Sequence, residues 1–229
     1  MAHKLPAVVL LAACAVLLAL AAPLVVGDPD MVQDICVADY KSLEDPLRVN
    51  GFLCKREMNV KADDFFFGGL AKAGDVYSGN PMGSAVTAAD VTVLPGLNTL
   101  GVSMARVDYA PWGGVNPPHA HPRATEIIFV LEGALEVGFV AAAANRLFSR
   151  TLSRGEVFVF PRGAVHFERS VGGAPAVAIS AFNSQLPGTQ TAAAALFGAS
   201  PAVATDVLAR AFQVDGGVVE NIKSKFSPK

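Results

Sequence analysis

Four side chains from two separate stretches of the sequence could together bind a metal ion. His119 and His121 lie two residues apart, Glu126 follows His121 by five residues, and His166 lies on a later segment. Three imidazoles and one carboxylate form an N₃O ligand set, which leaves two octahedral positions open for water or substrate. Such an open set is typical of a catalytic centre. By donor chemistry alone the ion could be manganese, iron, cobalt, nickel, copper or zinc.

The spacing of the first three residues predicts a strand followed by a break. Residues two apart on a strand point to the same face, so His119 and His121 can direct both imidazoles to one point. The odd offset of Glu126 would send it to the opposite face of a continuous strand. The segment 122–125 begins with proline, which removes a ladder donor, and a turn or bulge there resets the phase.

The second stretch presents His166 from another strand. Gly155, Pro161 and Gly163 bracket a strand at 156–160 and a tight turn, which leads into the strand that carries His166. Any single histidine could instead make only local hydrogen bonds. The agreement of spacing, strand phase and turn residues favours one shared metal site.

The rest of the chain predicts an all-β fold. From Ala85 onward, short runs rich in Val, Ile, Phe and Leu alternate with Gly and Pro, and the expected strands include 100–109, 126–132, 134–140, 156–161 and 176–182. Evenly spaced short strands predict a sandwich or barrel, here over residues 85–190. A hydrophobic content of 52% can fill a large core. The net charge of −2 and pI of about 6.1 argue against a nucleic-acid partner.

Residues 1–27 predict a secretory signal peptide. Lys4 gives a positive start, an apolar run covers Ala7–Leu20, and cleavage could follow Ala22 or Gly27. An uncleaved membrane anchor is the alternative, although Pro23 interrupts the apolar stretch and no basic cluster follows it. The mature protein is therefore expected to be secreted, with no membrane attachment.

Cleavage would leave two cysteines, Cys36 and Cys54, in an oxidising compartment. They allow a single intramolecular disulfide, which would stabilise the fold by about 3 kcal/mol in the chain-entropy model. Two buried free thiols are the alternative. Residues 28–84 are accordingly expected to form an irregular, disulfide-tethered extension with a short strand or two.

Residues 191–229 predict a helical region. Thr205 can cap a helix that runs to Phe212, where apolar residues recur at helical spacing. A second short helix is expected from about Gly217 to Lys225. Both helices are too short to be stable alone, so they should pack on the barrel or on a neighbouring subunit.

The two metal-binding stretches resemble the two motifs of the cupin superfamily. Gly113-x5-His119-x-His121-x4-Glu126-x6-Gly133 resembles the first motif, and Gly155-x5-Pro161-x-Gly163-x2-His166 resembles the second. The sequence from Asn116 to Glu126 is similar to that of plant germins and germin-like proteins. Further matches to these proteins cover the segments 33–39, 62–67, 98–103, 182–185 and 218–220.

The resemblance implies a cupin jelly-roll β-barrel whose C-terminal helices clasp a neighbouring chain. It implies Mn²⁺ at His119, His121, Glu126 and His166, a Cys36–Cys54 disulfide, a homohexamer built as a trimer of dimers, and residence in the apoplast. A redox activity on a small anion, with superoxide dismutation as the leading expectation, would suit a role in plant defence. One alternative is a non-catalytic apoplastic cell-wall or ligand-binding cupin, because this fold also hosts receptors and storage proteins. Another is an oxalate oxidase.

Three departures from the family pattern bear on activity. Family members that oxidise oxalate line the pocket with two asparagines. Asn116 matches one and is expected to hydrogen-bond water or substrate, whereas Ala105 replaces the other. Loss of that carboxamide argues against oxalate oxidase activity. Trp112 is an extra residue expected to reshape the pocket mouth, and Ser170 replaces an asparagine, with an expected effect on turn bonding.

Overall fold

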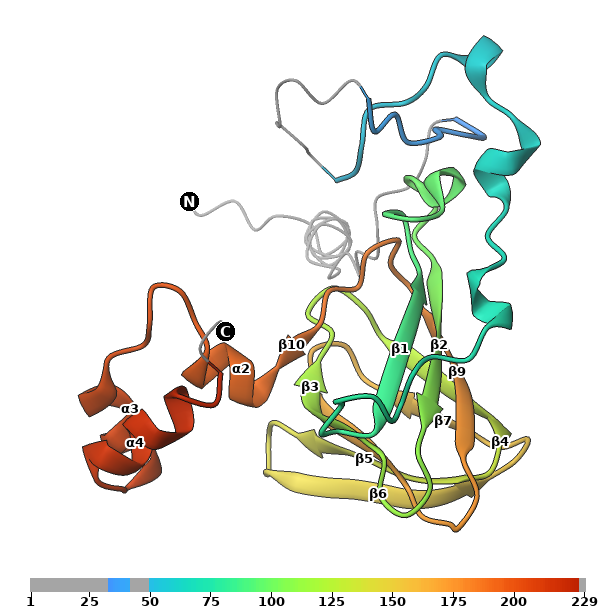
Figure 1. Cartoon of the computed structure of the whole chain (residues 1–229). Helices are drawn as coiled ribbons and strands as arrows, with labels where there is room; N and C mark the ends of the chain where they lie inside the picture. The colour runs from blue at the N-terminus through green and yellow to red at the C-terminus, as the bar shows by residue number, and fades with distance from the viewer. Residues whose placement is uncertain (1–32, 42–49, 227–229) are drawn as a thin grey trace, which may run out of the picture.

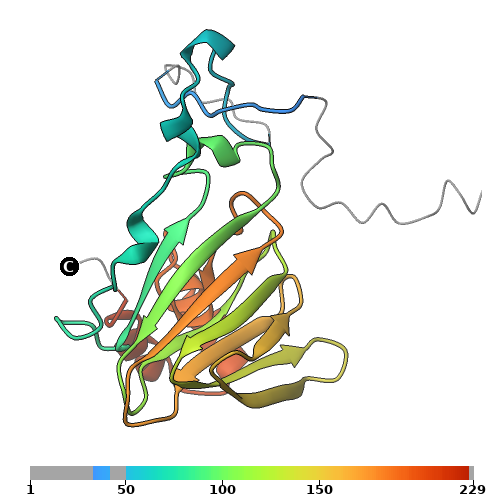
Figure 2. The same ribbon diagram turned by 90° about the vertical axis from the view of Figure 1, so that its right-hand side faces the viewer.

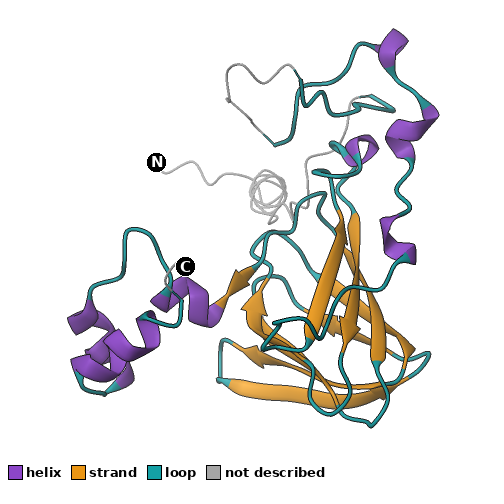
Figure 3. Ribbon diagram, in the orientation of Figure 1, coloured by secondary structure: helices purple, strands orange, loops and turns teal. Residues whose placement is uncertain are grey.

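The computed structural model describes residues 33–41 and 50–226, and these ranges form two packed antiparallel β-sheets (Figure 1). The predicted signal peptide lies outside the described residues. The helices lie outside the two sheets (Figure 3). No helix within the described ranges has both the length and the apolar character needed to cross a bilayer.

Ten strands build the two sheets. One sheet has the order β1-β2-β9-β4-β7 and the other β10-β3-β8-β5-β6. The strands are β1 Ser84–Ala89, β2 Ser103–Tyr109, β3 Val115–Ala120, β4 Glu126–Glu132, β5 Ala134–Ala141, β6 Arg146–Ser153, β7 Val157–Phe160, β8 Val165–Ser170, β9 Ala176–Phe182 and β10 Gln190–Thr191. From β6 to β10 the chain changes sheet at every step, as in a jelly roll. The prediction of an all-β jelly-roll barrel is confirmed.

Strand β4 shows why these sequences form two layers. Glu126, Ile128 and Val130 are buried between the sheets, whereas Ile127 and Phe129 face outward. This alternation follows from the period-two geometry of a strand. The core between the sheets consists of Val107, Tyr109, Ile128, Val130, Leu135, Val137, Leu152, Phe160, Ala176 and Ala178. Burial of each Leu or Ile side chain contributes about 1.5–3 kcal/mol to the free energy of folding. This packing holds in place the strands that carry the polar site.

The N-terminal extension packs at one end of the barrel (Figure 2). It contains the Cys36–Cys54 disulfide, so the predicted bridge is confirmed and the alternative of two free thiols is wrong. In place of the short strands expected there, its described part has one isolated bridge, Ala38–Cys54, and the 3₁₀ helices Glu57–Asn59, Ala62–Phe65 and Gly69–Ala71. Another 3₁₀ helix, Pro95–Leu97, precedes Asn98. The buried Asn98 side chain holds the extension by accepting from Phe52 N and donating to Phe52 O.

The C-terminal helices extend away from the barrel (Figure 1). They are α2 Ala192–Phe197, α3 Thr205–Phe212 and α4 Gly216–Lys223, so both predicted helices are present. The predicted cap is wrong, because the N-cap residue of α3 is Ala204 and no side chain caps it. The Thr205 hydroxyl instead donates to Glu220 on α4.

Candidate metal centre

The two sheets bring the four predicted site residues together. His119 on β3 and His166 on β8 are register partners, with ring centroids 4.1 Å apart. His121 follows the last residue of β3, and a turn then leads to Glu126, the first residue of β4 in the opposite sheet. The predicted break between His121 and Glu126 is therefore present. All four residues are buried.

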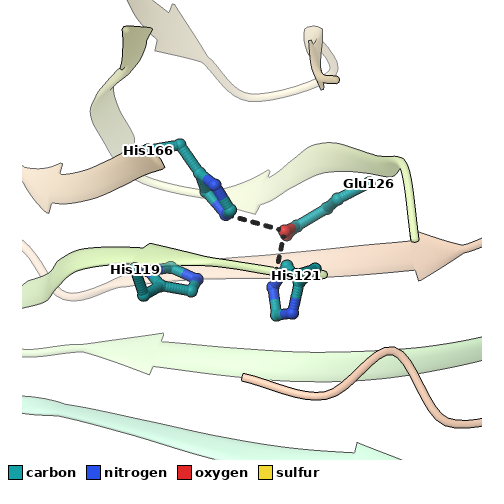
Figure 4. Close-up of side chains that lie close together, drawn as sticks. All are labelled: His119, His121, Glu126 and His166. Carbon is teal, nitrogen blue, oxygen red and sulfur yellow. Dashed lines mark hydrogen bonds and ion pairs between the residues drawn. The ribbon is translucent and has the colours of Figure 1, made fainter. Parts of the chain in front are cut away.

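Their donor atoms converge on one point (Figure 4). One donor atom from each residue lies within 4.8 Å of the other three. Glu126 Oε2 lies 3.0 Å from His121 Nε2 and 3.1 Å from His166 Nε2. Ligand atoms that sit about 2.1 Å from one octahedral ion lie about 3 Å apart when adjacent. The two measured separations match that spacing.

Backbone carbonyls orient all three imidazoles. His119 Nδ1 donates to Pro117 O at 2.9 Å, His166 Nδ1 donates to Ala164 O at 2.8 Å, and His121 Nδ1 donates to the Gly188 carbonyl. With the proton assigned to Nδ1, each neutral ring carries its lone pair on Nε2. Metal-ligating histidines commonly have their second nitrogen tied in this way.

This arrangement fits a divalent cation. Imidazole lone pairs and a carboxylate oxygen repel one another when they are brought within about 3 Å without a positive charge between them. A cation at the centre turns the same contacts into attractions. The donor set, the buried position and the fixed ring orientation therefore all suit a transition-metal ion.

The local electrostatics keep the ligands in their metal-binding forms. Burial and the nearby His166 lower the pKa of His119 to about 4. Burial raises the pKa of Glu126, but the neighbouring polar side chains of His121, His166 and Ser180 outweigh this effect and hold it at about 2. At neutral pH, His119 is thus neutral and Glu126 is ionised.

We expect the metal-free protein to lose stability as the pH falls from about 6.5 to about 4. Over this window His119 binds a proton in the unfolded chain but not in the folded chain, whose His119 pKa is about 4. Stability therefore rises with pH through the window, by up to about 3 kcal/mol. Urea unfolding of metal-free protein at several pH values measures the effect. The slope should flatten in His119→Gln, and an equal slope in both proteins would contradict the assignment.

The site opens into a cavity of about 310 Å³. Asn116 and Ala105 both line it, as the family pattern predicted, and Asn116 is its only carboxamide among the described lining residues. No lysine or arginine belongs to that lining. The apolar part of the wall is formed by Val86, Ala88, Met104, Val107, Phe182, Leu186 and Pro187.

Trp112 and Ser170 lie away from the cavity lining. Trp112 is 81% exposed, and its backbone N–H donates to Gly172 O, so the expectation that it shapes the pocket mouth is not met. Ser170 is buried at the end of β8, where its backbone N–H donates to Gly114 O. Its hydroxyl has no hydrogen-bond partner among the described residues.

Sequence reasoning missed two buried polar residues beside the site. Ser180 on β9 lines the cavity, and nothing in the sequence pattern marks it. Glu168 on β8 lies two residues beyond His166, with Oε1 3.9 Å from His166 Nε2. Burial raises the pKa of Glu168 well above its ordinary value. Strand alternation could have revealed Glu168, because residues 166 and 168 share one face.

Comparison with known proteins places the chain in a family. The cupin family model matches residues 69–220, which makes the protein a cupin. Germin-like protein 1-4 from Oryza sativa subsp. japonica is 75% identical over 235 residues, covering 100% of both chains. Germin-like protein subfamily 2 member 1 from Arabidopsis thaliana is 56% identical over 203 residues, covering 89% of this chain and 90% of the relative. The chain belongs to the germin-like proteins of plants.

A solved structure supports the same relationship. A recombinant oxalate oxidase in complex with glycolate aligns with a TM-score of 0.81 and 49% sequence identity. The alignment covers 87% of this chain and 98% of the oxidase.

Proposed function

We propose that His119, His121, Glu126 and His166 bind one Mn²⁺ ion and that the protein dismutates superoxide. The observation that carries the proposal is the convergence of imidazole Nε2 atoms on Glu126 Oε2 while every Nδ1 is held by a carbonyl. Superoxide dismutation needs a redox-active ion, which argues against Zn²⁺. Manganese is the choice implied by the family resemblance.

The side chains of the cavity suit a small anion. Bound manganese would supply one-electron exchange, by which two superoxide ions and two protons give dioxygen and hydrogen peroxide. The Glu126 carboxylate offsets added positive charge at the site, and the Asn116 amide can donate a hydrogen bond to the anion.

The same lining disfavours oxalate, the substrate named by the structural relative's activity. A dicarboxylate needs donors for both of its ends, and a site that lacks one leaves a desolvated charge unpaired. Here Asn116 is retained, whereas the Ala105 methyl group offers no donor. Oxalate oxidation is therefore the weaker candidate for this chain.

The proposal includes secretion to the apoplast as a homohexamer, with peroxide production serving plant defence. The disulfide supports an oxidising compartment. Self-association is supported by partly exposed apolar side chains on the outer face of one sheet and on the C-terminal helices. They include Ile127, Phe129, Val157, Val159, Val207, Phe212 and Val218.

A superoxide assay on Mn²⁺-reconstituted protein tests the function. The wild-type protein should accelerate superoxide decay, and His121→Ala should lose at least about 100-fold of that activity, because even outer partners of a metal site are worth 10–100-fold. Metal analysis of the same samples should show Mn²⁺ in the wild type only. Equal clearance by both proteins, or tight metal retention without any clearance, would reject the enzyme and favour a non-catalytic binder.

A further inference from the structure

The His121 imidazole is held by a part of the chain that is distant in sequence. Its Nδ1 donates to the carbonyl of Gly188, which lies 67 residues later. The other two histidines of the site, His119 and His166, donate to carbonyls only two residues earlier in the chain. The orientation of His121 therefore depends on where a separate segment lies.

Segment 186–189, which carries the Gly188 carbonyl, lies outside both sheets. It connects β9 to β10, and all four of its residues line the metal cavity. A segment outside the sheets lacks the ladder of hydrogen bonds that fixes a strand. Other contacts must therefore hold this segment, and with it the carbonyl, in place.

Arg123 supplies such contacts from the loop that follows His121. Its Nε donates to Leu186 O at 2.7 Å, and its backbone N–H donates to Pro187 O at 3.3 Å. The guanidinium also packs against Gly188, because a Cβ atom there would lie 2.7 Å from Arg123 Nη2. Gly188 has a φ of +68°, a left-handed conformation that glycine adopts without strain. Arg123 thus contacts three consecutive residues of the segment.

We propose that Arg123 is a positioning residue of the metal centre. It fixes segment 186–189 so that the Gly188 carbonyl keeps the His121 proton on Nδ1 and the Nε2 lone pair directed at the ion. This inference rests on the metal site of the proposed function. A guanidinium suits the task, because it offers several N–H donors in a rigid plane and stays protonated at every relevant pH.

The first test replaces Arg123 by methionine, which keeps an unbranched side chain and removes its donors. In protein loaded with Zn²⁺ as a diamagnetic probe, ¹⁵N-edited NMR should detect the Nδ1 protons of the three histidines. In Arg123→Met the His121 proton should exchange with water faster than in the wild type. The protons of His119 and His166 should be unchanged, since their carbonyl partners lie in their own segments. A residue that merely stabilised the fold would not alter one ring alone.

The second test is the affinity for Mn²⁺, measured by calorimetric titration. Arg123→Met should bind about 10-fold more weakly, at the lower end of the 10–100-fold expected for partners of metal ligands. Arg123→Lys keeps a cationic donor for the Leu186 carbonyl and should recover most of the affinity. Arg154→Met is the matched control, because Arg154 is exposed in the turn between β6 and β7. It should match the wild type in both measurements.

The outcomes separate this inference from the proposed function. Wild-type protein that binds neither Mn²⁺ nor Zn²⁺ would remove the metal centre and this role of Arg123 together. An unchanged His121 proton in a folded, metal-loaded Arg123→Met variant would overturn the role of Arg123 and leave the metal centre intact. Loss of the fold in the metal-free variant would likewise overturn it, because Arg123 would then be required for folding.

Discussion

Replacing Glu126 by glutamine should abolish Mn²⁺ binding and, with it, superoxide clearance. Glu126 is the only carboxylate among the four converging groups, and its Oε2 contacts both His121 Nε2 and His166 Nε2. Glutamine keeps the shape but removes the charge that balances the cation. We expect affinity to fall by more than about 100-fold, beyond the 10–100-fold typical of outer partners. Metal content after dialysis and a Mn²⁺ titration measure the loss.

Glu132→Gln is the matched control, because Glu132 lies at the other end of the same strand and is exposed. It should bind Mn²⁺ as the wild type does. Circular dichroism and thermal unfolding should show that the Glu126 variant remains folded without metal. A folded Glu126→Gln protein that retained Mn²⁺ through dialysis would show that the ion, if bound, lies elsewhere.

The substitution Ala105→Asn should confer oxalate oxidation or raise it. Ala105 on β2 is buried, and it lines the cavity together with Asn116. A second carboxamide there would supply the missing donor for a carboxylate. Hydrogen bonds to charged groups contribute about 1.5–3 kcal/mol, which corresponds to about 10–100-fold in kcat/KM for oxalate. Peroxide release from oxalate by the Mn²⁺-loaded protein is the readout.

Ala88→Asn controls for the added polarity. Ala88 is the register partner of Ala105 on the neighbouring strand β1, and it lines the same cavity. It should give no comparable gain with oxalate. Should Ala105→Asn fold, bind Mn²⁺ and still show no gain, the missing carboxamide would not be what limits oxalate oxidation.

That the four side chains of the site come together could be predicted, because the residue spacing and the turn residues near each of them indicate its orientation. Two-residue spacing placed His119 and His121 on one face, and the proline-led turn explained how Glu126 returns to the same interior. The strands β4 and β9 were predicted with their observed bounds, since each is a compact apolar run between turn residues.

Other features had no local signal. Strand β6 was missed because nearly all its side chains are exposed, so it lacks the alternation that marks a half-buried strand. Thr205 suggested a cap by its type, yet its hydroxyl contacts Glu220, whose approach depends on how α3 and α4 pack. Glu168 shows the opposite case. Its strand phase was readable, but only the three-dimensional structure reveals that its carboxyl group lies 3.9 Å from His166 Nε2.

The segment 186–191 ties the histidines to the C-terminal helices. Gly188 O accepts the His121 proton, Thr191 is the register partner of His119, and α2 begins at the next residue. Arg123 fastens the same segment by donating to Leu186 O. A displacement of the C-terminal helices α2–α4 would therefore act directly on the positions of His119 and His121. A chain that ended before residue 186 would lose the part of the cavity wall formed by residues 186–189. It would also lose the Gly188 carbonyl that orients the His121 imidazole.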